Sequence, residues 1–381
     1  MTGSLSRRKL LGASLSLPFL TTPPLTSARA SATLASGAIR WDAWDATGTT
    51  IEQGVDKSLS PPDFRGRAPW YAKLTSPTTI EIDGDHQSLL DDEIKFAMAA
   101  GLNYWAYVWY GPADPMQEAW RLHQASAYAN DVNWCMILGA SGLGTEESFS
   151  RLIPTYIRYF GQKNYQKVEG QRPLLYISMD NLTAFFKKWG SYGILFRTVI
   201  TELRQSCLSA GLGRPYIVIM EGEPVMASRV MAEIDADAIS NYMGRVPPHS
   251  HPTPFSVLDQ SVRTYWNEMA ATGAPVIPVC TTGWDTRPLK LNPPAFARGY
   301  VAGVGMNEYI QPGSPHEIAS HVQAAVNFVH NNPRVCPAKA IIIYSWNECA
   351  EGGSALVPSY TVAGRPNVSI LDAVGDVLKA N

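Results

Sequence analysis

The chain has 381 residues, with 31 lysines and arginines against 33 aspartates and glutamates, and 45% of its residues are hydrophobic. This composition is typical of a globular protein rather than a disordered or fibrous one. A net charge of −2 gives no electrostatic basis for binding nucleic acid or an anionic membrane surface. The 11 tryptophans and 17 tyrosines are unusual. Because these side chains combine a large apolar face with a polar atom, they favour a cleft that stacks ring-shaped ligands.

The first 30 residues are typical of an export signal. Arg7 and Arg8 precede an apolar run over residues 10–20, and Ala28-Arg29-Ala30 provides a cleavage site of the small-x-small type. The paired arginines indicate a twin-arginine signal, and the apolar run is shorter than the roughly 20 residues that span a bilayer. We therefore expect a periplasmic or secreted protein that has no membrane attachment after cleavage. The alternative is an uncleaved N-terminal anchor.

After residue 37, short apolar and β-branched runs alternate with longer amphipathic stretches, which is typical of an α/β domain. Eight strands are predicted, at residues 39–44, 102–108, 134–138, 173–178, 216–220, 238–242, 276–280 and 340–344. Helices are predicted at residues 89–100, 115–129, 145–160, 182–210, 224–234, 257–272, 316–331 and 370–379. The longest loops are expected at residues 45–85, 245–255 and 281–314.

Eight strand–helix units fit a single (β/α)8 TIM barrel over residues 31–381. About 250 residues are typical of this fold, so the remaining residues extend the loops that follow the strands. The alternative is an open, doubly wound sheet, which normally has a glycine-rich phosphate turn after its first strand. Trp41-Asp42-Ala43-Trp44-Asp45 stands at that place instead, which favours the barrel.

Polar and aromatic residues stand at the carboxyl ends of the predicted strands, where a barrel of this kind places its active site. Such a mixture is typical of sugar binding, because aromatic faces stack on sugar rings while carboxylates and amides bind hydroxyls. The predicted substrate-binding residues are Asp42, Trp44, Tyr110, Glu221, Tyr242, Trp284, Asp285, Arg287, Trp346 and Asn347. For Asp42 and Trp44 the alternative is packing at the barrel rim. For Asp285 and Arg287 it is an ion pair that pins a loop, and for Glu221 it is a structural ion pair.

Glu348 and Glu351 follow the last predicted strand and are predicted to be the catalytic residues. If this segment turns helically, side chains three residues apart lie on one face with Cβ atoms about 5–6 Å apart. That spacing suits the roughly 5–5.5 Å between the carboxyl groups of retaining glycosidases. Repulsion between two such carboxylates separates their pKa values, so that one stays protonated as an acid. The alternative is a solvent-facing pair favoured by the helix dipole.

The segment Trp346-Asn347-Glu348-Cys349-Ala350-Glu351-Gly352, followed by Leu356-Val357-Pro358, resembles the W-N-E-W-[AH]-E-G…[LI]-E-P motif of family-99 glycoside hydrolases. Related barrels encoded in O-antigen gene clusters share this motif. Gly283-Trp284-Asp285-Thr286-Arg287 is similar to the W-D-N-T-x-R segment of that second group. Residues 92–105 resemble the helix and G-[IL]-[DN]-x-[FW] sequence that lead into its second strand.

The resemblance implies a (β/α)8 fold and retaining cleavage of α-mannosidic bonds through a 1,2-anhydro sugar, with no metal or organic cofactor. Glu348 matches the glutamate that assists the substrate's own 2-hydroxyl as internal nucleophile. Glu351 matches the general acid, which then acts as base. Cys349 replaces the second tryptophan of the motif and Val357 replaces its later glutamate. The subsite that these residues line therefore differs, and the identity of the sugar does not follow from the resemblance.

Two other functions remain open on the sequence. One is a non-catalytic barrel that binds glycans and assists polysaccharide synthesis or export, with the two glutamates as hydroxyl ligands. The other is glycosyl transfer, which an exported protein without nucleotide-sugar donors performs only as transglycosylation. No metal site is expected, because the five cysteines form no C-x-x-C pair and His249 and His251 have no further ligand at a zinc spacing. The oligomeric state and the presence of a disulfide stay open.

Overall fold

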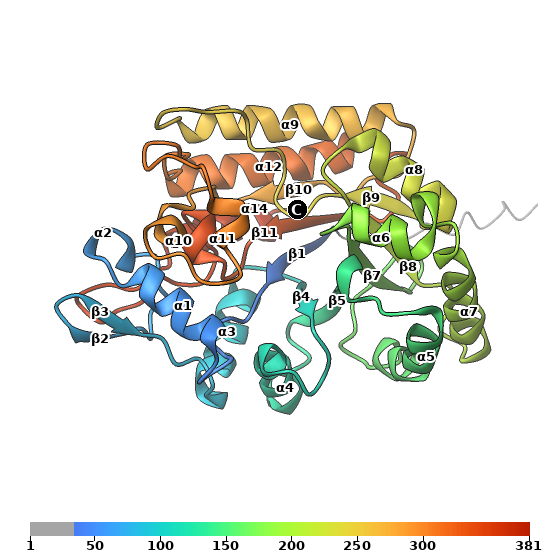
Figure 1. Ribbon diagram of the computed structural model, residues 1–381, viewed down its shortest axis with the longest axis horizontal. Coiled ribbons are helices and arrows are strands. Elements are labelled where there is room, and N and C mark those ends of the chain that lie inside the picture. Colours follow the sequence, from blue (N-terminus) through green and yellow to red (C-terminus); the bar gives the residue numbers. More distant parts are fainter. Residues whose placement is uncertain (1–33) are drawn as a thin grey trace, which may run out of the picture. The chain divides into compact units, whose positions relative to one another are not determined.

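The computed structural model describes residues 34–381, and the predicted export signal lies outside these described residues. At the centre is a ring of parallel strands, with helices around it (Figure 1). The strands of this ring are β1 (Ala35–Arg40), β4 (Tyr104–Trp109), β5 (Asn133–Gly139), β7 (Arg172–Ser178), β8 (Tyr216–Met220), β9 (Ala238–Ser240), β10 (Val279–Thr281) and β11 (Ala340–Tyr344).

The strands are arranged in the order β10-β11-β1-β4-β5-β7-β8-β9, and each pairs in parallel with its neighbours. The last gap is closed by a parallel bridge between Ile239 of β9 and Val276, just before β10. The ring therefore closes on itself, which confirms the predicted (β/α)8 barrel. The first and last strands of the chain, β1 and β11, are neighbours in it.

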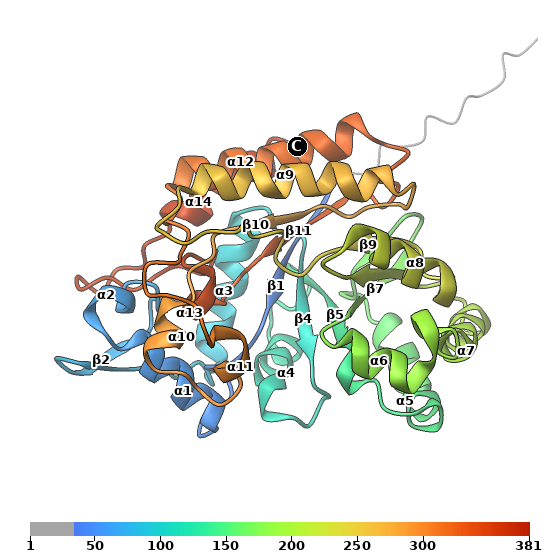
Figure 2. The same cartoon turned by 45° about the horizontal axis from the view of Figure 1, so that its top comes forward.

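Helices cover the outside of the barrel, and α9 and α12 lie side by side along one flank (Figure 2). The outer helices are α3 (Gln87–Ala99), α4 (Glu118–Ala125), α5 (Glu146–Phe160), α7 (Phe196–Ser209), α8 (Pro224–Ile234), α9 (Phe255–Ala271), α12 (Pro315–Asn331) and α14 (Ser369–Lys379). The start of α12 follows from its sequence. Ser314 and Glu317 form a reciprocal capping box, and Pro315 occupies the first helical position.

Large side chains fill the barrel interior. The hydroxyls of Tyr104 on β4 and Tyr176 on β7 are 2.8 Å apart inside the barrel. Gly37 of β1 provides the space for Tyr104, because a Cβ atom at this position would lie 2.1 Å from the tyrosine ring. The barrel is therefore a packed core, and its functional groups lie above the strand ends.

The boundaries of several predicted elements differ from those observed, and two of the differences have a clear physical reason. The first strand ends at Arg40, so that residues 41–44 belong to the following loop. The helix predicted at residues 182–210 is divided into α6 (Leu182–Trp189), a 3-10 turn η3 (Ser191–Gly193) and α7, because Gly190 and Tyr192 have φ values of 78° and 55°. Strand β10 begins only at Val279, since Pro278 has no N–H for the sheet.

The two longest predicted loops contain regular structure. The loop after β1 forms α1 (Thr50–Leu59), α2 (Pro62–Arg65) and an antiparallel hairpin of β2 (Lys73–Ser76) and β3 (Thr79–Glu81). The loop after β10 forms α10 (Arg287–Leu291) and α11 (Arg298–Val301). Helices α1 and α10 pack against each other, so the two loops together build one wall above the barrel.

All five cysteines are buried free thiols. Within residues 34–381, no helix has both the length and the apolar character that a membrane crossing requires.

Candidate active site

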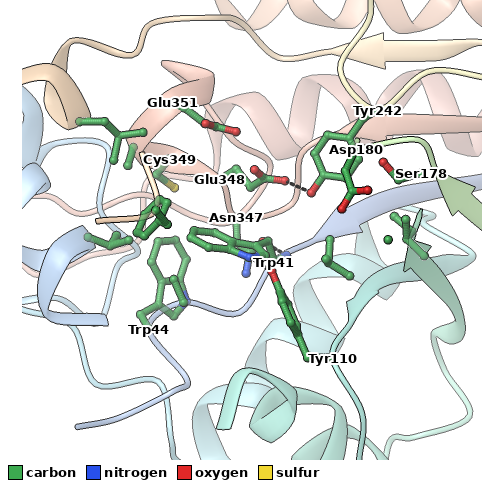
Figure 3. A pocket seen from close by; sticks show the side chains of 18 residues that line it. Trp41, Trp44, Tyr110, Ser178, Asp180, Tyr242, Asn347, Glu348, Cys349 and Glu351 are labelled. Atoms are coloured by element: carbon green, nitrogen blue, oxygen red, sulfur yellow. Dashed lines mark hydrogen bonds between the residues drawn. The ribbon is translucent and has the colours of Figure 1, made fainter. Parts of the chain in front are cut away.

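The loop after β11 forms one helical turn, α13 (Cys349–Gly352), which begins directly after Glu348. The backbone N–H of Gly352 donates to the carbonyl of Glu348 at 2.8 Å and closes the turn. The helical conformation expected from the spacing is therefore present. It brings Glu348 and Glu351 to the wall of one cavity of about 400 Å³ at the carboxyl end of the barrel (Figure 3).

Two tyrosine hydroxyls orient the carboxylates. Tyr242, just after β9, donates to Oε1 of Glu348 at 2.6 Å, and Tyr344, the last residue of β11, donates to Oε1 of Glu351 at 2.7 Å. The two tyrosine rings contact each other, with centroids 5.7 Å apart. Each carboxylate is thus held by a residue from a barrel strand or its end, and the α13 backbone is held by a bond from the Asp285 N–H to the Glu351 carbonyl.

The environment of Glu348 raises its pKa well above the ordinary value. Burial is the largest cause, followed by the negative charge of Glu351 and a hydrogen bond with that residue, whereas the Tyr242 hydroxyl acts in the opposite direction. The unliganded site therefore favours a proton on Glu348. This is the arrangement of two close carboxyl groups of which one stays protonated, as general acid catalysis requires.

Asn347 lies beside the pair and also lines the cavity. Its Oδ1 accepts from the backbone N–H of Trp41 at 2.9 Å, and its Nδ2 donates to the carboxylate of Asp42 at 3.2 Å. Its predecessor Trp346 is fully buried and lies outside the cavity, where its indole N–H donates to Glu93 of α3 at 3.0 Å. Asn347 is thus placed to contact a ligand, and Trp346 anchors the segment behind it.

Asp42 belongs to a buried charge cluster behind the cavity wall, which we define as Arg40, Asp42, Asp45 and Glu93. Arg40 at the end of β1 is fully buried and contacts all three carboxylates. Burial raises the pKa of Asp42 to about 6, against the lowering effect of Arg40. Asp42 therefore reaches the cavity only through Asn347, and its predicted substrate contact stays a prediction.

Trp284, Asp285 and Arg287 lie next to α13 but do not line the cavity. Arg287 donates to both carboxylate oxygens of buried Asp285, at 2.8 and 2.7 Å, and Arg67 also pairs with it. Burial alone would raise the pKa of Asp285, but the two guanidinium groups outweigh it and lower that pKa. The geometry is that of an ion-pair cluster that pins loops, the alternative left open by the sequence.

Of the four remaining predicted residues, three line the cavity and one does not. Trp44, Tyr110 and Tyr242 line the cavity, and the Tyr110 hydroxyl accepts from the indole N–H of Trp41 at 2.8 Å. The carboxylate of Glu221 accepts from the backbone N–H groups of the two residues that follow it and does not line the cavity.

The structure adds residues that were not predicted. Asp180, just after β7, lines the cavity and accepts from the N–H and hydroxyl of Ser141 at 2.9 and 2.5 Å. It also lines an adjacent cavity of about 380 Å³ between the ends of β4 and β5 and helix α5. Its position at the end of a predicted strand is the sequence signal that marks it. Leu289 and Phe296 also line the first cavity, but they come from a long loop and no sequence signal marks them.

Within the described chain, no group of three or more His, Cys, Asp or Glu side chains is arranged to hold a metal ion. The chemistry available in the cavity is that of two carboxyl groups, tyrosine hydroxyls and amides.

No protein-family model matches the sequence, and no curated protein is significantly similar to it. Solved structures share its fold. The GH99 endo-α-mannosidase from Bacteroides thetaiotaomicron, in complex with bis-tris propane, is similar with a TM-score of 0.58 and 12% identity, over 91% of this chain and 96% of that chain. Another structure of the GH99 endo-α-mannosidase from this organism has a TM-score of 0.54 and 11% identity, with 91% and 96% of the two chains covered. The chain therefore has the (β/α)8 fold of the GH99 glycoside hydrolases.

Proposed function

We propose that the protein is an exported glycoside hydrolase that cleaves a poly- or oligosaccharide with retention of configuration, using Glu348 and Glu351. The observation that carries this proposal is the carboxylate pair, which one helical turn presents to a single cavity at the carboxyl end of the barrel. The shared fold with GH99 endo-α-mannosidases supports it. α-Mannosides are therefore the first substrates to test.

In the proposed reaction, Glu348 accepts the proton of the substrate's 2-hydroxyl while that oxygen attacks the anomeric carbon. Glu351 donates its proton to the leaving oxygen, and the bond to the leaving group breaks to give a 1,2-anhydro sugar. Water then attacks the anomeric carbon and transfers a proton to Glu351, and the opened 2-oxygen recovers its proton from Glu348. Two inversions at the same carbon give net retention.

The proton on the pair must lie on Glu351 when the reaction starts, although the unliganded site favours Glu348. Substrate binding provides a physical route. A 2-hydroxyl that donates a hydrogen bond to Glu348 stabilises its carboxylate, as the Tyr242 hydroxyl already does, and so lowers its pKa. The proton of the pair then moves to Glu351, beside the leaving oxygen.

A glycan panel with α- and β-linked oligosaccharides tests the proposal on the mature protein. We expect wild type to release reducing ends, with products of retained configuration by proton NMR. Glu351→Gln and Glu348→Gln should each lower kcat/KM by about a thousandfold, within the usual contribution of general acid–base catalysis. Glu223→Gln is the control, because Glu223 is exposed and lies outside the cavity.

Hydrolysis that persists in Glu351→Gln would rule out the assigned roles. The alternative function, a non-catalytic glycan-binding barrel, is favoured by one observation, since Cys349 stands where the motif has tryptophan. That protein would bind glycans on an array and release no reducing ends.

A further inference from the structure

The cavity has two chemically different halves, with Glu348 between them (Figure 3). On one side lie hydroxyl, carboxylate and phenol groups of Tyr110, Ser178, Asp180 and Tyr242, from the ends of β4, β7 and β9. Val108, Ile137 and Gly139 of β4 and β5 complete the lining of the cavity beside them. On the other side the lining is apolar apart from the carboxylate of Glu351, which lies beside Cys349. We call this side the apolar chamber and define it by Ala43, Trp44, Val55, Leu289, Phe296, Cys349 and Ala350.

The apolar chamber is built by the two long loops that pack together above the barrel. Val55 comes from α1, Leu289 from α10, and Phe296 from the segment before α11. Val55 and Leu289 are 2% and 1% exposed, so they are fixed by packing, whereas Phe296 is 38% exposed at the rim. Phe296 also contacts the ring of Trp41, with centroids 5.2 Å apart. The chamber is a formed part of the fold next to the carboxylates.

A sugar ring does not suit this chamber. Each ring hydroxyl that leaves water needs a hydrogen-bond partner, and a buried hydroxyl without one is unfavourable. Apart from the Glu351 carboxylate, which the proposed reaction places at the leaving oxygen, the chamber side chains offer only the indole N–H of Trp44, which has no partner among the described residues, and the buried thiol of Cys349. Aromatic stacking on a sugar face does not replace the hydrogen bonds that the ring edge needs.

The charges of the cavity lining exclude an anionic group in the chamber. No lysine, arginine or histidine of residues 34–381 lines the cavity, while Glu348, Glu351 and Asp180 do. A phosphate next to the scissile bond would meet carboxylates and no counter-charge. The occupant of the chamber is therefore neutral as well as apolar.

We propose that the apolar chamber binds the aglycone of the substrate, and that this aglycone is a neutral hydrophobic group, an alkyl chain or an aromatic ring, attached to the sugar through oxygen. The glycone carries the ring hydroxyls and so occupies the polar half, which leaves the other side of the scissile bond to the chamber. This inference rests on the proposed hydrolase function and narrows its substrate: the glycone is one sugar or several, and the leaving group is apolar rather than a further sugar. Replacement of the motif's tryptophan by Cys349 is consistent with it, because the smaller side chain leaves space in the chamber.

Pairs of methyl and octyl glycosides of the common hexoses, in α and β configuration, test the inference by calorimetric binding to wild type and to Glu351→Gln. All are used below the micellar concentration. We expect the preferred octyl glycoside to bind at least about tenfold more tightly than its methyl counterpart, since each methylene that leaves water contributes about fourfold. The corresponding 2-phenylethyl glycoside distinguishes an aromatic from an alkyl occupant. The disaccharide with the same glycone should bind no better than the methyl glycoside.

Phe296→Asn tests the site of binding with little risk to folding, because Phe296 is partly exposed. It should reduce the ratio between the affinities for the octyl and the methyl glycoside at least about threefold. Leu291→Asn is the matched control. Leu291 lies on the neighbouring α10 helix, is 50% exposed and does not line the cavity, so its replacement should change neither affinity.

The outcomes separate this inference from the proposed function. Octyl glycosides that bind no more tightly than methyl glycosides, or an octyl advantage that survives Phe296→Asn, would overturn the apolar aglycone site even if oligosaccharides are hydrolysed. A Phe296-dependent octyl advantage without hydrolysis of any glycoside would retain the apolar site and reject the hydrolase.

Discussion

At the carboxylate pair, neighbouring groups act on Glu348 in opposite directions. Burial and Glu351 favour its protonated form, and the Tyr242 hydroxyl favours its carboxylate. In the proposed reaction Glu348 must be ionised to accept the proton of the 2-hydroxyl. The acid limb of the pH–activity profile therefore reports on this residue.

Tyr242→Phe removes the hydrogen bond that stabilises the carboxylate, so the pKa of Glu348 rises further. We expect the acid limb of the kcat/KM profile to move to higher pH, so that activity at low pH is lost before activity at high pH. Tyr128→Phe, at a partly exposed tyrosine outside the cavity, should leave the profile unchanged. If Tyr242→Phe lowers activity equally at all pH values, Tyr242 has a role other than control of the proton on Glu348.

Glu348→Gln should also change stability. Because the folded-state pKa lies above the ordinary value of 4.5, the native state binds the proton more tightly than the unfolded chain, and stability falls as pH rises from about 4.5 through the folded pKa. Glutamine removes this penalty. We expect Glu348→Gln to melt about 1–3 °C above wild type at pH 8, and the difference to disappear below pH 4.5. A variant that melts below wild type at pH 8 would contradict this assignment.

At this scale two signals predicted the carboxylate pair. The spacing places both side chains on one face of a helical turn, and the segment resembles the family-99 motif. It left the roles of Asp285 and Arg287 open, because Arg67, the second cation on Asp285, is 218 residues away in the chain. Tertiary contacts of this kind leave no local pattern. The apolar chamber was not predicted for the same reason.

Among the elements, β1 and α3 are joined by the buried charge cluster. Arg40 of β1 contacts Glu93 of α3 and Asp42 and Asp45 of the intervening loop, and its guanidinium lies 4.8 Å from the ring of Trp105. One cation thus faces three buried carboxyl groups, and burial raises the pKa of two of them, Asp42 and Asp45. The same cluster holds the Trp346-Asn347 segment through Glu93 and Asp42.

Arg40→Gln leaves the three carboxylates without a buried counter-charge. We expect a loss of about 3–5 kcal/mol in the free energy of unfolding at pH 7, measured by urea denaturation. The loss should shrink as pH falls, because protonation of the carboxyls removes the unpaired charge. Arg151→Gln, at an exposed arginine of α5, is the control and should cost less than about 0.5 kcal/mol. Equal effects of the two replacements would show that the cluster does not join β1 to α3.

The periodicity of the sequence identified the order and type of the barrel elements because strands buried in a parallel sheet are short apolar runs. The residues at which strands and helices begin and end were harder to predict from the sequence. Apolar Trp41 and Trp44 extend the pattern of β1 although the strand ends at Arg40, and the break between α6 and α7 depends on backbone conformations at Gly190 and Tyr192.

At the scale of the whole molecule, we propose that the protein acts outside the cytoplasm. Replacement of the paired arginines Arg7 and Arg8 tests this proposal. Arg7→Lys together with Arg8→Lys should block export and leave the full-length precursor in the cytoplasm, as judged by cell fractionation and immunoblotting. The melting temperature of the purified barrel should not change. Export of the double variant at the wild-type level would reject the twin-arginine route.

The meeting of β1 and β11 has a consequence for how the protein is made. The backbone N–H of Trp41 bonds to Asn347, 306 residues later, and β1 pairs with β11 along four residues. A ribosome must therefore translate the roughly 300 residues between β1 and β11 before the two walls of the cavity come together. A nascent chain that stops before Glu351 has no carboxylate pair facing Trp41, so the proposed activity requires that this segment has been synthesised.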